Sequence, residues 1–451
     1  MALTFQPFYL ACLAHGSYLI GDGGECAIVD PQRDVAQYID EAAKLGMSIR
    51  YVIETHLHAD FVSGHIELAN RTGAEIVMGA QAGATFPHRA VHDGDTLPLG
   101  GIELRIMETP GHTPESISIV VVENGAPTKV LTGDTLFIGE VGRPDLAGGR
   151  GFTSEGMAAM LYDSLHDKLL ALPDDVEVWP AHGAGSACGK NISKERSSTI
   201  GVQRRTNYAL APMPRDEFVK MLTTDIAPPP PYFAKDAAIN RGGARPLAEV
   251  HAPHLTPSAA IAFIEEGGIA IDVRDPLYFG ASHIPTSLNI GLGGQFASWA
   301  GTLLSFDDRL VVIAEDEERA NEAVMRLARV GLENVIGWIA FNEWPFKTRS
   351  LAQITPSQLR DERQQMHVLD VRGPGEYASG HVPGAQLVPL NELAKRMTEI
   401  EDTLPLAVIC ASGYRSSIAA SLLERSGREA VINVIGGTGA WRRDGFDVES
   451  A

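Results

Sequence analysis

The chain has 451 residues, 44% of them hydrophobic, and its 57 acidic against 37 basic side chains give a formal net charge of -20. This length predicts two to four domains of roughly 100–200 residues each, and the acidic balance excludes nucleic acid and anionic membranes as expected partners. Four cysteines, Cys12, Cys26, Cys188 and Cys410, are too few for a disulfide framework and indicate free thiols in the cytoplasm. The first residues lack the basic start of a signal peptide, and no apolar run in the sequence reaches the roughly 18 residues of a membrane span.

The first segment runs to about Arg241 and alternates strand-like with helix-like runs. Apolar residues predict strands over 26–30 and 50–54, and helical spacing predicts a helix over 35–45 that stops at Gly46. The four consecutive prolines at 228–231 begin a boundary region before the next domain.

The most informative motif directly follows the strand predicted over 50–54. His56, His58 and Asp60 occupy alternating positions there, and a turn would aim these imidazole and carboxylate groups at one point, as in a metal site at a strand end. Phe61 stands where a dinuclear zinc hydrolase would carry a further histidine. Phenylalanine cannot ligate a metal, so the motif favours one metal ion over two.

Three further polar residues follow strand-like runs or lie in glycine- and proline-rich turns. His112 lies in the turn 108–114, Asp134 follows Leu131 to Gly133, and His182 follows Val178 to Ala181. Each alone is weak evidence, since a loop histidine is usually an ordinary surface residue. Together, in this order, they predict a metal centre.

These motifs resemble the metallo-β-lactamase superfamily, and within it the persulfide dioxygenases. The resemblance covers the first segment and implies an αββα sandwich with the site at one edge. It also implies one Fe(2+) per chain, bound by His56, His112 and Asp134, a set of two imidazoles and one carboxylate that suits non-haem iron. It implies that His58, Asp60 and His182 orient the ligands and hydrogen-bond bound water or oxygen.

Two further residues of this segment have two interpretations each. Arg143 lies in a run that resembles the substrate loop of the family, where it would hold a carboxylate of a thiol tripeptide in a bidentate pair. The alternative is a structural salt bridge with Asp145. Cys188 lies in a glycine-rich loop soon after His182. There it would place a sulfur-accepting thiol at the pocket mouth, or it would be a packed and inert cysteine.

An internal repeat follows the boundary region. Asp272 precedes His283 by the same spacing as Asp370 precedes His381, because 283 − 272 = 381 − 370. Each copy continues with an apolar strand and a helix, which predicts two small α/β domains with mostly parallel sheets. The predicted domains are 1–241, 250–350 and 351–451.

The second copy carries a candidate nucleophile. Cys410 follows the strand predicted over 406–409, and a helix is expected from Ser417. Backbone N–H groups of the loop and the cation of Arg415 would favour the thiolate at Cys410. The loop and the whole of 351–451 resemble the rhodanese family, which implies a persulfide on Cys410 as covalent intermediate. Substrate contacts are expected from Ser412, Gly413 and Tyr414.

The first copy departs from this pattern. Ala314 stands at the position of Cys410, and the four residues after it are Glu315, Asp316, Glu317 and Glu318. These carboxylates would repel a thiolate and an anionic donor such as thiosulfate. The region 250–350 therefore resembles a rhodanese fold without rhodanese chemistry, and its role is open.

We therefore expect a sulfide-detoxifying enzyme that joins two activities. The first domain would oxidise a thiol persulfide, with glutathione as the expected thiol, by O2 to sulfite. The last domain would transfer sulfane sulfur through Cys410 and link sulfite to thiosulfate. The alternatives are a glyoxalase II-type thiolester hydrolase and a non-enzymatic persulfide carrier or sensor. The thiol, the direction of transfer and the oligomeric state stay open, and a homo-oligomer is allowed.

Overall fold

The computed structural model describes residues 3–401 and 404–450, and the chain divides into two compact units. The first comprises residues up to 249 together with 328–331, and the second comprises 250–327 and the chain from 332 onward. Among the described residues, no helix combines the length and the apolar character that crossing a bilayer requires.

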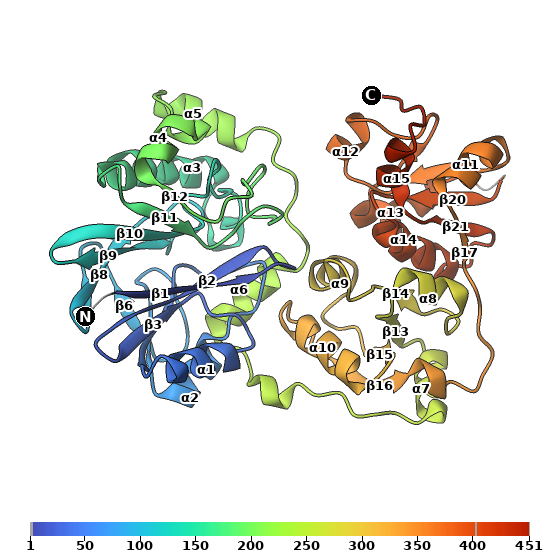
Figure 1. Cartoon of the computed structure of the whole chain (residues 1–451), viewed down its shortest axis with the longest axis horizontal. Helices are drawn as coiled ribbons and strands as arrows, with labels where there is room; N and C mark the ends of the chain where they lie inside the picture. Colours follow the sequence, from blue (N-terminus) through green and yellow to red (C-terminus); the bar gives the residue numbers. More distant parts are fainter. Residues whose placement is uncertain (1–2, 402–403, 451) are drawn as a thin grey trace. The chain divides into compact units, whose positions relative to one another are not determined.

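Two six-stranded sheets form the first unit (Figure 1). One has the order β1-β2-β3-β4-β5-β6, with β1 (Thr4–Leu10), β2 (His15–Asp22), β3 (Glu25–Val29), β4 (Ser48–Glu54), β5 (Glu75–Gly79) and β6 (Arg89–Val91). The other has the order β12-β11-β10-β9-β8-β7, with β7 (Thr96–Leu99), β8 (Ile102–Glu108), β9 (Ile117–Glu123), β10 (Ala126–Gly133), β11 (Glu177–Pro180) and β12 (Ser198–Thr199).

The facing sides of these sheets share one hydrophobic core. Ile20 and Ile53 of the first sheet belong to the same buried cluster as Leu104, Ile119 and Leu131 of the second. Side chains alternate between the two faces of a strand, so each sheet also has an outer apolar face to cover. Helices α1 and α2 cover the first sheet, and α3, α4 and α5 cover the second (Figure 1). The bounds are α1 (Ala36–Lys44), α2 (His65–Thr72), α3 (Ser154–Asp163), α4 (Ile200–Thr206), α5 (Arg215–Thr223) and α6 (Phe233–Gly242).

This layer order is the predicted αββα sandwich. The helix predicted over 35–45 is α1, and the strands predicted over 26–30 and 50–54 are β3 and β4, each within two residues of its predicted bounds. Strand β3 is parallel to β4, and β10 is parallel to β11. Parallel strands end at the same edge of a sheet, so the residues that follow these pairs are brought together.

Each repeat of the second unit has its own sheet. The first has the parallel order β14-β13-β15-β16, with β13 (Ile269–Asp272), β14 (Leu288–Asn289), β15 (Leu310–Ala314) and β16 (Val335–Ala340). The second has the parallel order β17-β21-β20-β18-β19, with β17 (Ala352–Ile354), β18 (His367–Asp370), β19 (Gln386–Leu387), β20 (Leu406–Ile409) and β21 (Val431–Val434). The predicted parallel sheets are confirmed.

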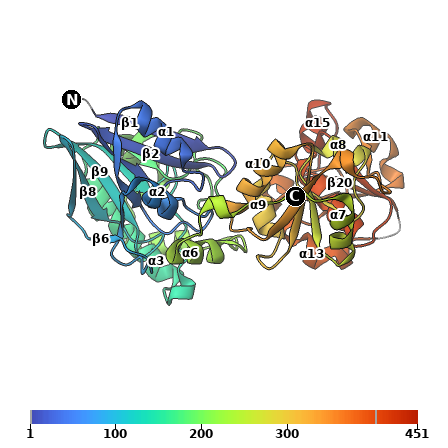
Figure 2. The same cartoon turned by 90° about the horizontal axis from the view of Figure 1, so that it is seen from below.

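Helices surround both sheets (Figures 1 and 2). The first repeat has α7 (Pro257–Glu265), α8 (Pro276–Ala281), α9 (Phe296–Leu303) and α10 (Glu317–Ala328). The second has α11 (Pro356–Glu362), α12 (Pro374–Ala378), α13 (Leu393–Arg396), α14 (Tyr414–Arg425) and α15 (Gly437–Arg443). Helix α14 begins three residues before the predicted start at Ser417. Gly413 precedes it with φ of 105°, a conformation open to glycine, and this lets the chain turn into the helix directly after the cysteine loop.

The aspartate that begins the repeated Asp-to-His pattern has a structural role in both copies. Arg274 binds Asp272 through two nitrogens, at 2.9 and 2.6 Å, and Arg372 binds Asp370 in the same way, at 3.0 and 2.7 Å. These buried pairs hold the loops that follow β13 and β18. The repeat therefore records a shared fold and by itself says nothing about chemistry.

Candidate functional site

The three predicted metal ligands meet at the strand-end edge of the sandwich. Ligand atoms of His56, His112 and Asp134 all lie within 4.8 Å of one another. The Nε2 atoms of His56 and His112 are 3.7 and 3.5 Å from Oδ2 of Asp134. Among the described residues, Nε2 of His56 and Oδ2 of Asp134 have no hydrogen-bond partner although they are buried. Orphaned buried ligand atoms that face one point fit a metal ion.

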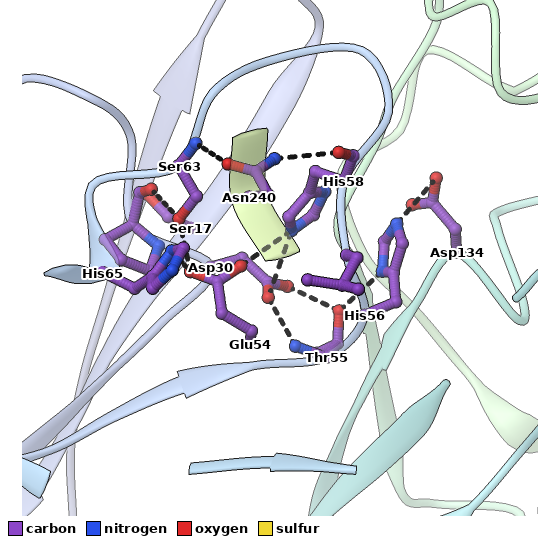
Figure 3. A network of polar contacts seen from close by, with 12 residues as sticks. Ser17, Asp30, Glu54, Thr55, His56, His58, Ser63, His65, Asp134 and Asn240 are labelled. Carbon is purple, nitrogen blue, oxygen red and sulfur yellow. Dashed lines mark hydrogen bonds and ion pairs between the residues drawn. The ribbon is translucent and has the colours of Figure 1, made fainter. Parts of the chain in front are cut away.

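Hydrogen bonds on the far side of each imidazole set its orientation. Nδ1 of His112 donates to the carbonyl oxygen of Arg143 at 2.9 Å. Nδ1 of His56 donates to the Thr55 hydroxyl at 3.0 Å, and that hydroxyl donates to Oδ2 of Asp30 at 2.9 Å (Figure 3). Both rings therefore turn the lone pair of Nε2 toward Asp134, as metal-binding histidines require.

The protonation of the three residues suits cation binding. Burial lowers the pKa of His56 well below its ordinary value and also lowers the pKa of His112. For Asp134 burial acts in the opposite sense, but the facing histidines His182 and His56 hold its pKa well below the usual range. The site thus presents two neutral imidazoles and one carboxylate.

His58, Asp60 and His182 form a second group beside the first. Nε2 of His182 lies 2.8 Å from Oδ2 of Asp60, and its Nδ1 lies 2.7 Å from Oδ1 of Asp134. Although burial opposes the charged form, Asp134 and Asp60 raise the pKa of His182 well above its ordinary value. His182 bridges the two carboxylates and fixes which oxygen Asp134 presents to His56 and His112. This geometry is consistent with the orienting role predicted for His182, which stays a prediction.

Phe61 fills the space next to this second group. Its ring is almost fully buried, with its centroid 4.5 Å from that of His58 and 4.2 Å from that of His15. A packed apolar ring offers no ligand there, although Oδ1 of Asp60 and both ring nitrogens of His58 are buried without a hydrogen-bond partner among the described residues. The lack of a ligand at Phe61 is the basis for the prediction of one metal ion, and the number of ions stays a prediction.

Two carboxylates near the centre were missed from the sequence. Nε2 of His58 lies 3.2 Å from Asp30 and 3.6 Å from Glu54 (Figure 3). Glu54 also accepts a hydrogen bond from Ser63 and lies 3.3 Å from Nδ1 of His65. Burial opposes protonation of His58, but Asp30 and Glu54 raise its pKa. The sequence did contain a signal for these two residues, because Asp30 and Glu54 end two apolar strand-like runs, which are neighbours in the sheet.

Thr55→Val is expected to lower the affinity of the site for a metal ion by roughly 10–100-fold, because the hydroxyl that links Asp30 to His56 is lost while the side-chain shape is kept. The free energy of unfolding should fall by about 1–3 kcal/mol, since a buried oxygen of Asp30 loses a donor. Chelator competition and thermal unfolding measure the two effects. Thr55→Ser keeps the hydroxyl and is the control, and equal metal affinity in both variants would contradict the role.

Arg143 is engaged within the protein. Its Nε and Nη2 donate to the two oxygens of Asp145 at 2.7 Å each, and it also donates to the carbonyl oxygens of Ala187 and Ala227. This geometry favours the structural salt bridge over binding of a substrate carboxylate. Arg143 nevertheless lines a cavity of about 400 Å³ together with Tyr208.

A second cavity, of about 280 Å³, adjoins the loops that carry the ligands. Its wall includes Leu57 and Ala59, the chain neighbours of His56 and His58, and Thr113, which follows His112. Two arginines, Arg150 and Arg241, also line it. These cations were not singled out from the sequence because the fold alone brings them to the cavity.

Cys188 lies against the metal pocket. Its sulfur is within 4.8 Å of ligand atoms of Asp134 and His182, and its side chain is 1% exposed. Burial, and then the charges of Asp60 and Asp134, raise its pKa well above the ordinary value. The location suits a contact with substrate, whereas the raised pKa disfavours the thiolate that a sulfur acceptor needs.

The predicted sulfur-transfer loop surrounds Cys410 with donors. The Cys410 sulfur is buried and accepts a hydrogen bond from the Gly413 N–H at 3.1 Å, and the Ser416 hydroxyl oxygen lies 3.5 Å from it. The Ser416 hydroxyl donates to Oδ1 of Asn433 at 2.6 Å, a residue that the sequence did not suggest. This cradle suits a sulfur anion at the start of α14.

Arg415 lies at the same loop and is held by an acid. Its two terminal nitrogens each lie 2.7 Å from an oxygen of Glu376. These hydrogen bonds raise the pKa of Arg415, and the nearby Cys410 adds to the shift. The cation is thus fixed near the sulfur. Glu376 is a positioning residue that the predicted site set did not include.

Ser412, Gly413 and Tyr414, the predicted substrate contacts, line a cavity of about 670 Å³. The corresponding loop of the first repeat differs. Ala314 is fully buried at the end of β15, and the N–H of Arg319 is bound by Asp316 at 2.9 Å. No sulfur stands there, so the structure agrees with a copy that lacks the nucleophile.

Comparison with known families and proteins identifies the two kinds of fold. Residues 11–182 match the metallo-beta-lactamase superfamily, and residues 256–340 and 355–444 each match the rhodanese-like domain. The mitochondrial persulfide dioxygenase ETHE1 of Homo sapiens is 30% identical over 238 residues, which cover 51% of this chain and 86% of that protein.

Two further similarities concern other members of the superfamily. The hydroxyacylglutathione hydrolase of Rhodospirillum rubrum is 36% identical over 162 residues, covering 35% of this chain and 57% of that protein. The crystal structure of a metallo-beta-lactamase from Staphylococcus aureus subsp. aureus COL has a TM-score of 0.67 and 32% identity, covering 75% of this chain and 98% of that one. That similarity extends beyond the first unit into the repeats.

Proposed function

The chain belongs to the metallo-beta-lactamase superfamily and continues into two rhodanese-like regions, and we propose that it is a sulfur-metabolism enzyme with two active sites. The domain over 1–241 would oxidise a thiol persulfide with O2, in the balance GSSH + O2 + H2O → GSH + SO3²⁻ + 2H⁺ for glutathione persulfide. The domain over 351–451 would carry sulfane sulfur on Cys410 between thiol, sulfite and thiosulfate. The domain over 250–350 lacks the nucleophile.

The convergence of His56, His112 and Asp134 carries this proposal. Two neutral Nε2 atoms and one carboxylate oxygen on one side of a metal ion are the set that non-haem iron uses with open positions opposite. An iron(II) ion held by these three residues would supply a place for O2 beside the persulfide sulfur. Phe61 stands where a further histidine ligand would be needed for a second metal ion, and His182 bridges Asp60 and Asp134. Both features support one ion per chain.

The protein groups would hold and shield the reactants. His182 keeps one oxygen of Asp134 away from the metal position, while Thr55 and the carbonyl of Arg143 keep both imidazoles directed at it. The cavity beside Leu57 and Ala59 would take the organic part of the persulfide, with Arg241 as a cation in its wall. Arg150, also in the wall, is paired with Glu115 and donates to the carbonyl oxygen of Gln81. All four cysteines are free, which suits the proposed cytoplasmic setting.

Metal analysis of the chain purified without added metal is the most direct test of this proposal. We expect about one iron per chain, and oxygen uptake with glutathione persulfide that is matched by sulfite production. Chelation should remove both the iron and the oxygen uptake, and iron(II) should restore them. Two tightly bound zinc ions per chain, with activity retained, would refute the assignment.

A thiolester hydrolase of the glyoxalase II type is the second candidate, since His58, Asp60 and His182 lie where a further metal would bind and the Rhodospirillum rubrum hydrolase is similar over this domain. The third is a persulfide carrier without oxidation. Oxygen uptake separates the three, because hydrolysis of S-lactoylglutathione consumes no O2 and a carrier forms neither sulfite nor lactate.

A further inference from the structure

The cysteine-less repeat reaches the sulfur-transfer loop of the other repeat. The Tyr414 hydroxyl donates to the carbonyl oxygen of Gly291 at 2.8 Å, and the Ser417 hydroxyl donates to Oδ1 of Asn289 at 2.6 Å. The residues on both sides of Arg415 and Ser416 are therefore bound to the first repeat. The backbone of Gly294 in the first repeat also lies close to the Tyr414 ring, since a Cβ at this glycine would be 2.5 Å from that ring.

Asn289 is itself fixed within the first repeat. Its fully buried side chain donates to the carbonyl oxygens of Asp272 and Arg274 at 3.1 and 3.0 Å, and its N–H donates to the Ser421 hydroxyl at 3.0 Å. A buried amide with all these partners holds its neighbours in one arrangement. The first repeat therefore sets the position of the first turn of α14.

Both repeats line the cavity of about 670 Å³ beside this loop. Asp275, Leu277 and Gly293 come from the first repeat, and Ser412, Gly413 and Tyr414 come from the second. Gln353 of β17 donates to the carbonyl oxygens of Pro276 and Leu277 at 3.3 and 3.2 Å, which fixes this wall. Gly413 lines the cavity, and its N–H donates to the buried Cys410 sulfur at 3.1 Å.

The volume of the cavity and the charges of its lining residues indicate which class of ligand it binds. Its volume lies in the range of small-molecule sites, whereas thiosulfate, with five heavy atoms, would fill only a small part. Asp275 and Asp444 offer carboxylates, Arg443 offers a guanidinium, and Ser412 offers a hydroxyl. Groups of both signs suit a thiol that carries ammonium and carboxylate groups. The net charge of -20 disfavours a polyanion such as coenzyme A.

We propose that this cavity binds the organic part of an amino-acid or peptide thiol, of the glutathione type, while its sulfur exchanges with Cys410. The proposal rests on the proposed role of Cys410 as sulfur carrier. In the exchange the acceptor thiolate attacks the outer sulfur of the Cys410 persulfide, one S–S bond forms as the other breaks, and Cys410 leaves as the thiolate with the electron pair. No oxidant is consumed. The cysteine-less repeat thus supplies one wall of a substrate site.

A bulky substitution on the first repeat tests this site with little risk to folding. Leu277 lines the cavity and is 55% exposed, and its neighbour Tyr278 is 63% exposed and is not part of the cavity wall. Leu277→Trp narrows the cavity, and Tyr278→Trp is the matched control on the same helix. The full-length chain is loaded with thiosulfate, and transfer is measured to cyanide, glutathione and coenzyme A.

We expect Leu277→Trp to raise the KM for glutathione by roughly tenfold or more, the effect of a blocked pocket on a bound group. Transfer to cyanide should be unchanged, because this small acceptor needs only the sulfur, and Tyr278→Trp should match wild type with all acceptors. Wild type should use glutathione better than coenzyme A.

Each other result has a distinct meaning. Equal loss with cyanide and glutathione would show that Leu277→Trp distorts the loop, and it would overturn the cavity as a thiol site. An unchanged KM for glutathione would overturn it as well. A preference for coenzyme A would overturn the thiol class. Failure of wild type even with cyanide would refute Cys410 as a carrier, and thus the proposed function of this domain.

Discussion

His112→Ala is expected to abolish oxygen consumption with glutathione persulfide while leaving sulfur transfer from thiosulfate to cyanide unchanged. His112 supplies one of three ligand atoms that face one point, and its Nε2 lies 3.5 Å from the Asp134 carboxylate. Removing one of three ligands would leave the proposed iron site incomplete, so iron content should fall together with oxygen uptake. The nucleophile Cys410 belongs to a separate compact unit, so its chemistry should continue.

An oxygen electrode, metal analysis and a thiocyanate assay measure the three quantities on one preparation. His92→Ala is the matched control, because His92 is exposed in the same domain and lies outside the metal site. Circular dichroism and thermal unfolding establish that the variant folds. Loss of both activities in a folded His112→Ala chain would refute the assignment of independent sites, and retained oxygen uptake would refute His112 as a ligand.

Cys410→Ser is expected to remove sulfur transfer, whereas Ala314→Cys is not expected to create it in the first repeat. A serine hydroxyl is far too weakly acidic to provide the anion that a cysteine offers. At Ala314 the acidic run from Glu315 to Glu318 would raise the pKa of a thiol and repel an anionic donor. The cradle also differs, since the Cys410 sulfur accepts the Gly413 N–H at 3.1 Å within a loop that carries no acidic side chain.

Mass spectrometry after incubation with thiosulfate is the readout. Wild type should gain one sulfur, Cys410→Ser should gain none, and the double variant Cys410→Ser with Ala314→Cys should also gain none. Sulfur found on Cys188 of the Cys410→Ser chain would reverse the proposed order of transfer. The raised pKa of the buried Cys188 opposes that result. Sulfur on the introduced cysteine of the double variant would show that the acidic loop does not govern reactivity.

Much of the architecture is readable from local patterns. Strand β4 and helix α1 follow from apolar spacing, and the two parallel sheets of the repeats follow from the matched runs around Asp272 and Asp370. His56 and Asp134 are predictable as candidate site residues because they lie two residues after β4 and one residue after β10, where side chains collect at one edge of a sheet. The absence of a nucleophile in the first repeat is equally local, since Ala314 replaces a cysteine.

Only the tertiary structure decides which of these groups find partners. The sequence leaves Arg143 between substrate binding and a salt bridge, and the contacts to Asp145 and Ala227 favour the salt bridge. It places Cys188 near His182, but burial, which determines the state of the thiol, depends on the packing of distant segments. Hydrogen bonds and desolvation act over a few ångströms in space, and sequence spacing does not record such distances.

The sequence by itself determined the strand-end histidines, the repeat, the presence of Phe61 where a further histidine ligand would stand, and the presence of a cysteine in only the second repeat loop, because these depend on residue identity and short-range periodicity. The tertiary structure alone decided that Asp30 acts through Thr55 on His56, and that Asn289 of the cysteine-less repeat binds the first turn of α14. Those links join residues that are far apart in the chain. They exist because parallel strands end at a common edge and because two repeats pack against each other, which no local pattern specifies.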